Sequence, residues 1–212
     1  NVRLVEANLN RCFLKEQPEE IVRSLEGKTA REIIPYLEKA DFMLDVHASF
    51  TKDSKPFVIC RESLIEEARI FDSDLVVCNF DPFEPGSTDY YMNLLNKPGF
   101  CFECGYLGDS KTQEIAEKAI SSFLIYYGSI NSNLEKPRMQ KALKIKSLYK
   151  NIQGQFKMAR YFPDFEQLKE RTLIGRDGQK DVYCESGDIV LFVRDMDRIG
   201  EECFLVAEER IT

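Results

Sequence analysis

The chain contains a single histidine, and the residues before it decide what chemistry it can do. His47 follows the apolar run Phe42-Met43-Leu44, and Asp45 lies two residues before it, on the same face of a strand. A neutral imidazole in this position is a candidate metal ligand that a neighbouring carboxylate can orient. The alternative is a structural histidine that only makes hydrogen bonds.

A carboxylate within an apolar run is the second candidate. Glu103 lies in Phe100-Cys101-Phe102-Glu103-Cys104-Gly105, where an acidic side chain is costly to bury unless it is paired or its pKa is raised. Either condition suits a general base at the carboxyl end of a strand, and the alternative is a buried ion pair with an arginine. Cys101 and Cys104 have the spacing of a zinc or redox pair, but positions three apart on a strand point to opposite faces. We therefore expect reduced thiols there.

Arginines and asparagines gather near the start of the chain, in Arg3-Leu4-Val5-Glu6-Ala7-Asn8-Leu9-Asn10-Arg11. The guanidinium group is the preferred bidentate partner of a carboxylate, so this segment is a candidate for binding an anionic substrate. Arg11 lies between apolar Leu9 and Phe13, and a partly buried arginine needs an anion. An internal salt bridge to Asp or Glu would also supply one.

The overall charge limits the partners that the chain can have. Its 212 residues include 36 acidic and 29 basic side chains, for a formal net charge of −7. Broad binding to nucleic acid or to an anionic membrane needs a basic face, so we expect neither partner. No apolar run approaches the ~20 residues of a membrane-spanning helix. Seven cysteines, an odd number in a chain too long for a small disulfide scaffold, predict reduced thiols and a cytoplasmic protein.

Strands and helices must alternate to position these groups. Apolar runs predict strands at residues 42–47, 56–60, 74–79 and 99–103, and amphipathic stretches predict helices at 29–39, 62–70, 88–95 and 111–127. Pro35 predicts a kink or a later start in the first of these helices. The alternation predicts an α/β fold with a mostly parallel or mixed sheet flanked by helices. Because His47 and Glu103 both follow apolar runs typical of strands, we expect them at the same edge of this sheet.

The composition changes after Asn131. Residues 130–137 are typical of a linker, and short strands and turns follow them. We therefore expect an α/β domain at 1–136 and a small β-rich domain at 137–212. The chain begins with Asn1 rather than Met, so we expect it to be a piece of a longer protein.

Taken in order, these motifs resemble the succinylglutamate desuccinylase and aspartoacylase family of zinc-dependent amidohydrolases, which belongs to the wider zinc carboxypeptidase-like group. Asn8-Leu9-Asn10-Arg11-Cys12-Phe13 is similar to the family's Asp-Leu-Asn-Arg-x-Phe, with Asn8 in place of Asp. Arg3 stands at the spacing of the family's preceding arginine. Asp45-Val46-His47 resembles the family's Asp-Leu-His, which supplies a zinc ligand, and Glu103-Cys104-Gly105 resembles the Glu-x-Gly that carries its general base. The resemblance covers roughly residues 1–130 and extends loosely to the β-rich tail.

The chain departs from the family pattern in two places. The family's His-Gly-x-Glu segment, which supplies the other two zinc ligands, has no counterpart and would lie before residue 1. The sequence shows no cysteine or carboxylate cluster at ligand spacing around His47, so we expect this chain alone to bind zinc weakly or not at all. An arginine that aspartoacylases place shortly before the base is missing from residues 91–97, which leaves the acyl group and the amino acid of the substrate open.

The resemblance implies hydrolysis of the amide bond of a small anionic N-acyl amino acid. Zinc, held by His47 and two upstream ligands, would activate a water molecule, and Glu103 would take its proton and return it to the departing nitrogen. Arg3 would stabilise the oxyanion, while Arg11 and Asn10 would hold a substrate carboxylate. The β-rich domain would cover one side of the cleft.

Two other functions remain open on the sequence alone. One is a metallocarboxypeptidase-like enzyme that acts on short peptides and shares His47, Arg3 and Glu103 with the first reading. The other is a non-catalytic protein that has kept the scaffold. Hydrolysis of N-acyl amino acids compared with hydrolysis of dipeptides separates the two enzymes, and an upstream segment without His and Glu would be the sign of the non-catalytic protein.

Overall fold

The computed structural model describes residues 5–49, 51–52 and 54–210, so Arg3 lies outside the described residues. The chain divides into two compact units, Asn1–Lys141 and Ala142–Thr212. In the part of the chain that the structure describes, no helix has the length and apolar character needed to cross a membrane.

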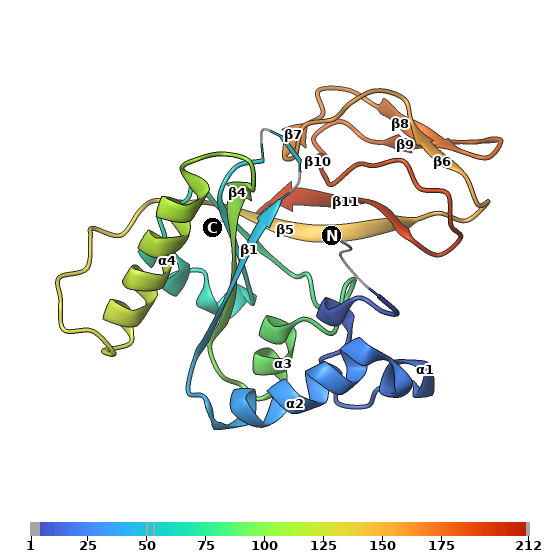
Figure 1. Cartoon of the computed structure of the whole chain (residues 1–212). Helices are drawn as coiled ribbons and strands as arrows, with labels where there is room; N and C mark the ends of the chain where they lie inside the picture. The colour runs from blue at the N-terminus through green and yellow to red at the C-terminus, as the bar shows by residue number, and fades with distance from the viewer. Residues whose placement is uncertain (1–4, 50, 53, 211–212) are drawn as a thin grey trace. The chain divides into compact units, whose positions relative to one another are not determined.

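A mixed sheet forms the centre of the first unit (Figure 1). Its strands, in the order β1-β4-β2-β3, are β1 (Met43–Ser49), β4 (Gly99–Tyr106), β2 (Phe57–Cys60) and β3 (Leu75–Cys78). β1 runs parallel to β4 and β2 runs parallel to β3, whereas β2 and β4 are antiparallel. The predicted α/β class with a mostly parallel or mixed sheet is confirmed, in its mixed form.

Helices cover both faces of this sheet. α4 (Thr112–Tyr126) lies on one side of β1 and β4, and α3 (Thr88–Leu94) lies on the other (Figure 1). On the α4 side, four aromatic rings pack against one another: Phe71, Phe100, Phe102 and Phe123. Since side chains alternate along a strand, Phe100 and Phe102 leave the intervening Cys101 and the next residue, Glu103, to the α3 side.

The remaining helices of the first unit precede β1 or connect β2 to β3. Their bounds are η1 (Leu9–Arg11), α1 (Glu19–Arg23), α2 (Leu25–Lys39), η2 (Glu62–Leu64) and η3 (Glu67–Ile70). The single helix predicted at 62–70 is wrong, because two 3₁₀ turns make this connection, a role for which such turns are common.

Helix α2 also differs from its prediction. It begins before residue 29, because Ser24 Oγ accepts a hydrogen bond from Gly27 N at 2.9 Å and caps its first turn. The helix also continues through Pro35. Pro35 and Arg31 are both exposed, so water can satisfy the Arg31 carbonyl that proline leaves without an amide donor.

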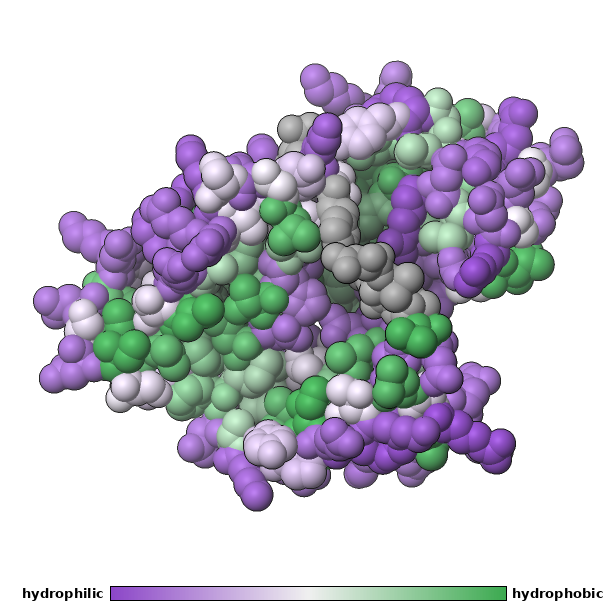
Figure 2. Space-filling view, in the orientation of Figure 1, coloured by the Kyte–Doolittle hydropathy of each residue, from purple (hydrophilic) through white to green (hydrophobic). Residues whose placement is uncertain are grey.

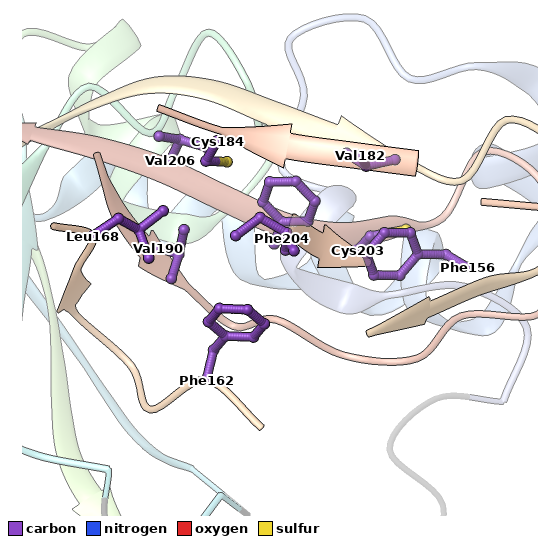
Figure 3. Packing of buried hydrophobic residues seen from close by; sticks show 10 residues of the cluster. Phe156, Phe162, Leu168, Val182, Cys184, Val190, Cys203, Phe204 and Val206 are labelled. Carbon is purple, nitrogen blue, oxygen red and sulfur yellow. The ribbon is translucent and has the colours of Figure 1, made fainter. Parts of the chain in front are cut away.

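The second unit is β-rich, as expected. β5 (Lys141–Lys150), β11 (Glu202–Glu209), β10 (Ile189–Leu191) and β7 (Glu166–Gln167) pair antiparallel in that order. β6 (Phe156–Met158), β8 (Thr172–Asp177) and β9 (Lys180–Cys184) form a second antiparallel sheet. The buried side chains of Phe156, Phe162 and Phe204 gather in the core of the second unit (Figure 3).

An apolar area lies over α4 and β1 on the face of the molecule seen in Figure 2. Val46 on β1, Ile120 and Tyr126 on α4, and Leu107 between β4 and α4 are exposed large apolar side chains. The α3 side of the sheet has a different character, because polar and ionisable groups replace the aromatic rings there.

Candidate functional site

The register of β1 and β4 brings the two strongest sequence candidates together. His47 pairs with Glu103, and two residues earlier Asp45 pairs with Cys101. Paired residues on neighbouring strands share a face of the sheet, so all four side chains lie on the same side. One ligating atom from each of His47, Cys101 and Glu103 lies within 4.8 Å of the other two. The predicted common edge for His47 and Glu103 is therefore observed as direct strand pairing.

Hydrogen bonds orient the imidazole of His47. Its Nε2 lies 2.9 Å from Asp45 Oδ1, and Thr88 Oγ1 donates to Asp45 Oδ2 at 2.5 Å. The hydrogen bond with Asp45 raises the pKa of His47 more than burial lowers it. Burial raises the pKa of Asp45, but the contacts with His47 and Thr88 outweigh it and hold that pKa below its ordinary value. A chain of contacts thus runs from α3 through Asp45 to the imidazole.

The same contacts indicate which ring nitrogen is available. Asn10 Nδ2 also approaches Nε2, at 3.4 Å. Among the described residues, both polar contacts of the His47 ring are made by Nε2, which leaves Nδ1 for a ligand. A carboxylate behind one nitrogen and a metal at the other is the usual arrangement of a metal-binding histidine.

Asp89 is a member of this neighbourhood that the sequence reasoning missed. Its side chain is buried on α3, and Ser87 Oγ donates to Asp89 Oδ1 at 2.5 Å. Burial, with the nearby Asp81 and Asp45 carboxylates, raises the pKa of Asp89 to about 6 despite the Ser87 hydrogen bond. The sequence signal that could have identified Asp89 is local: Ser87-Thr88-Asp89 is the start of a helix, and Ser87 caps it.

A cavity of about 220 Å³ lies beside Asp89, at the ends of β2 and β3. Arg61, Asn79 and Asp81 are among its lining residues. The Nε of Arg61 is buried without a hydrogen-bond partner among the described residues. A larger cavity, of about 540 Å³, lies beside the start of α4, and His47 lines it together with Val46, Cys104 and Ala116 among others.

The segment with Asn10 and Arg11 folds against the start of α3. Asn8 caps η1 by accepting from Asn10 N at 3.1 Å. Arg11 Nη2 forms an ion pair with Glu84 Oε2 at 2.6 Å, and Arg11 Nη1 donates to its neighbour's carbonyl oxygen, Asn10 O, at 2.7 Å. A substrate carboxylate at Arg11 would therefore share this guanidinium with Glu84, whereas Asn10 stands beside the imidazole.

Gly86 holds this segment in place, and we expect Gly86→Ala to destabilise the first unit by about 2–4 kcal/mol. Its φ is +99°, and an added Cβ would lie 2.7 Å from Arg11 C and 2.8 Å from Arg11 O, backbone atoms that cannot rotate away. Gly128→Ala is the matched control, since its φ is +75° but nothing lies within 4 Å of the added Cβ. It should cost about 1 kcal/mol. Urea unfolding measures both, and equal losses would show that Gly86 makes no special contact.

The donor set fits zinc. Imidazole nitrogen, thiolate sulfur and carboxylate oxygen are the ligands that zinc takes from proteins. The expectation that no cysteine or carboxylate clusters around His47 is wrong in three dimensions, because Cys101 and Glu103 come from a neighbouring strand rather than from nearby sequence.

No protein family profile and no curated protein sequence matches this chain. Solved structures do match. The succinylglutamate desuccinylase from Vibrio cholerae is 18% identical, with a TM-score of 0.80 over 100% of this chain and 68% of its own. The succinylglutamate desuccinylase/aspartoacylase from Rhodobacter sphaeroides is 16% identical, with a TM-score of 0.68 over 97% of this chain and 69% of its own.

A third similar structure is the product-bound ectoine utilization protein EutE (DoeB) from Ruegeria pomeroyi. It is 19% identical, with a TM-score of 0.66 over 95% of this chain and 67% of its own. The chain thus spans about two thirds of the length of these proteins and has their fold. The fold that the motif resemblance implied is confirmed.

Proposed function

We propose that this protein, which folds like the succinylglutamate desuccinylases and aspartoacylases, hydrolyses the amide bond of an N-acyl amino acid with zinc at His47. One observation carries the proposal: His47 and Glu103 are paired in register on two parallel strands, and Asp45 supports the imidazole from behind. The names of the similar proteins support a small acylated amino acid as substrate.

Each residue of the site has a proposed task. His47 holds the metal through Nδ1, with further ligands from outside residues 1–212, and Asp45 keeps Nε2 engaged. Bound zinc would polarise the amide carbonyl and lower the pKa of water toward ~7. Glu103 takes a proton from the attacking water and passes it to the leaving nitrogen. Asn10 and Arg11 bind a carboxylate of the substrate, and Arg3, outside the described residues, stabilises the oxyanion.

We also propose a role for each part of the chain. We propose that residues 1–136 form the catalytic α/β domain and that the β-rich domain, residues 137–212, limits the size of the substrate. All seven cysteines are buried as thiols, which supports a cytoplasmic protein.

A substrate panel tests the proposal. The purified protein is incubated with N-succinyl and N-acetyl amino acids and with dipeptides, and released amine is measured before and after chelation and zinc addition. We expect zinc-dependent hydrolysis of at least one N-acyl amino acid, faster than of any dipeptide. Faster dipeptide hydrolysis would favour a carboxypeptidase-like enzyme, and no hydrolysis of either class would favour a non-catalytic protein.

We expect Asp45→Asn to weaken zinc binding by about 10–100-fold, the usual effect of removing the carboxylate behind a ligating histidine. The amide keeps the shape of the side chain but not the charge that raises the pKa of His47. Competition with a zinc-binding dye measures the change. Asp41→Asn is the control, because Asp41 is exposed just before β1. Equal affinities in the two variants would remove Asp45 from this role.

A further inference from the structure

The mixed sheet has a second carboxyl edge, and the cavity of about 220 Å³ lies on it. β1 and β4 carry His47 and Glu103 near their carboxyl ends, but β2 runs the other way: its first residue, Phe57, pairs with Glu103, and its last residue, Cys60, pairs with Phe100. The carboxyl ends of the parallel neighbours β2 and β3 therefore lie about 10 Å along the strands from Glu103. In open α/β sheets, ligands bind beside the carboxyl ends of parallel strands.

Arg61 follows β2 directly and lines this cavity as a cation without an anion. Its Nε is buried without a hydrogen-bond partner, and no carboxylate in the described part of the chain forms an ion pair with its guanidinium group. Arg69, on the same connection between β2 and β3, does have such a partner, because its Nη1 lies 2.7 Å from Glu66 Oε2. A partly buried guanidinium without an internal anion is a place where the carboxylate of a ligand can bind.

Two carboxyl groups reach the same cavity from other elements. Asn79, directly after β3, has a φ of +67°, a left-handed conformation that asparagine tolerates, and this turn brings Asp81 to the cavity wall. Asp81 Oδ2 accepts a hydrogen bond from Asn93 Nδ2 at 2.9 Å. Asp89, on α3, is 4% exposed, and Ser87 is the only other residue in the described part of the chain that donates to its carboxyl group. Burial raises the pKa of both carboxyl groups, as expected for acids that have no cation beside them.

We propose that this cavity binds a free α-amino acid, whose carboxylate pairs with Arg61 and whose ammonium group is held by Asp89, with Asp81 beside it. A single zwitterion supplies both charges that the cavity lacks, an anion for the guanidinium and a cation for the acids. The volume of about 220 Å³ is smaller than that of pockets for drug-sized ligands, so it suits an amino acid with a small or medium side chain. The site is separate from His47, and the inference goes beyond the proposed function without resting on it.

Isothermal titration calorimetry with each standard L-amino acid, in the presence of a chelator, tests the proposal on the 212-residue protein. We expect at least one amino acid to bind with a Kd of about 1 mM or lower, a strength within reach of so few atoms. Its two analogues, the carboxylic acid without the ammonium group and the amine without the carboxylate, should each bind at least tenfold more weakly.

Variants locate the binding site. Arg61→Gln and Asp89→Asn should each weaken binding of the best amino acid at least tenfold. Arg23→Gln is the matched control, because Arg23 is exposed on α1, and it should leave the Kd within a factor of about two. His47→Ala should also leave the Kd unchanged, because the metal site is not used.

Three results would overturn the proposal: no binding of any amino acid at about 10 mM, equal binding of either analogue, or binding that is lost in His47→Ala and kept in Arg61→Gln. The last result would place the amino acid at the metal site instead. Circular dichroism confirms that each variant is folded. If Arg61→Gln does not fold, nuclear magnetic resonance of the ¹⁵N-labelled unmodified protein decides the question. The amide signals of Arg61, Asn79 and Asp81 should shift with the best amino acid, and shifts confined to residues around His47 would contradict the proposal.

Discussion

Glu103→Gln is expected to lower kcat by about a thousand-fold, within the 10²–10⁴-fold range that a general base contributes. The amide has the shape of the carboxylate and stays in register opposite His47, so the sheet should be preserved. What it lacks is a proton acceptor for the attacking water. Steady-state hydrolysis of the best N-acyl amino acid measures kcat, and plasma emission measures the zinc content of the same samples.

Glu114→Gln is a suitable control for this experiment. Glu114 is exposed on α4, so the same chemical change there should leave kcat within a factor of about two. A Glu103→Gln protein with near-normal turnover at unchanged zinc content would remove Glu103 from the mechanism. A protein that has lost its zinc would instead show that this carboxylate holds the metal.

His47→Ala is expected to abolish stoichiometric zinc binding and, with it, turnover. His47 is the only histidine of the chain, so no other imidazole can take its place. Plasma emission measures zinc after dialysis. We expect about one zinc per chain in the protein that carries all of its zinc ligands, and less than a tenth of that in its His47→Ala variant. Melting temperatures of the two metal-free proteins provide the control, because they should agree if the change acts through the metal.

Two results would revise this view. Zinc retained by His47→Ala would place the metal elsewhere. One zinc per chain bound by residues 1–212 alone, and lost in His47→Ala, would contradict the expectation of weak binding that follows from one histidine. Cys101 and Glu103 would explain such binding, because one ligating atom of each lies within 4.8 Å of a ring nitrogen of His47.

The parts of the fold that depend on local patterns were predictable. β1 to β4 all appear where apolar runs of four to eight residues occur, and α4 appears where apolar residues repeat at helical spacing. The common location of His47 and Glu103 followed from one principle, that parallel strands deliver side chains to one edge of a sheet. The antiparallel direction of β2 was not predictable, because its short apolar run is the same in either direction.

The parts of the site that depend on register were not predictable. Cys101 lies opposite Asp45 only because β1 and β4 pair as they do, and a shift of one residue would turn it to the other face. Likewise, the partner of Arg11 is Glu84, which is distant in sequence and becomes a neighbour only when the segment around Gly86 folds back. Asp89 is near His47 because α3 packs on β1, a contact between elements.

The burial of all seven cysteines makes the protein its own reporter of unfolding. Since a buried thiol reacts with an alkylating reagent only after the surrounding structure opens, the labelling rate at each cysteine measures the free energy of that opening. Five cysteines lie in the first unit, whereas Cys184 and Cys203 lie in the second. Mass spectrometry of partly labelled protein therefore follows the two units separately in one sample, without an added dye. If the second unit opens alone, labelled molecules carry two labels. If both units open together, labelled molecules carry seven.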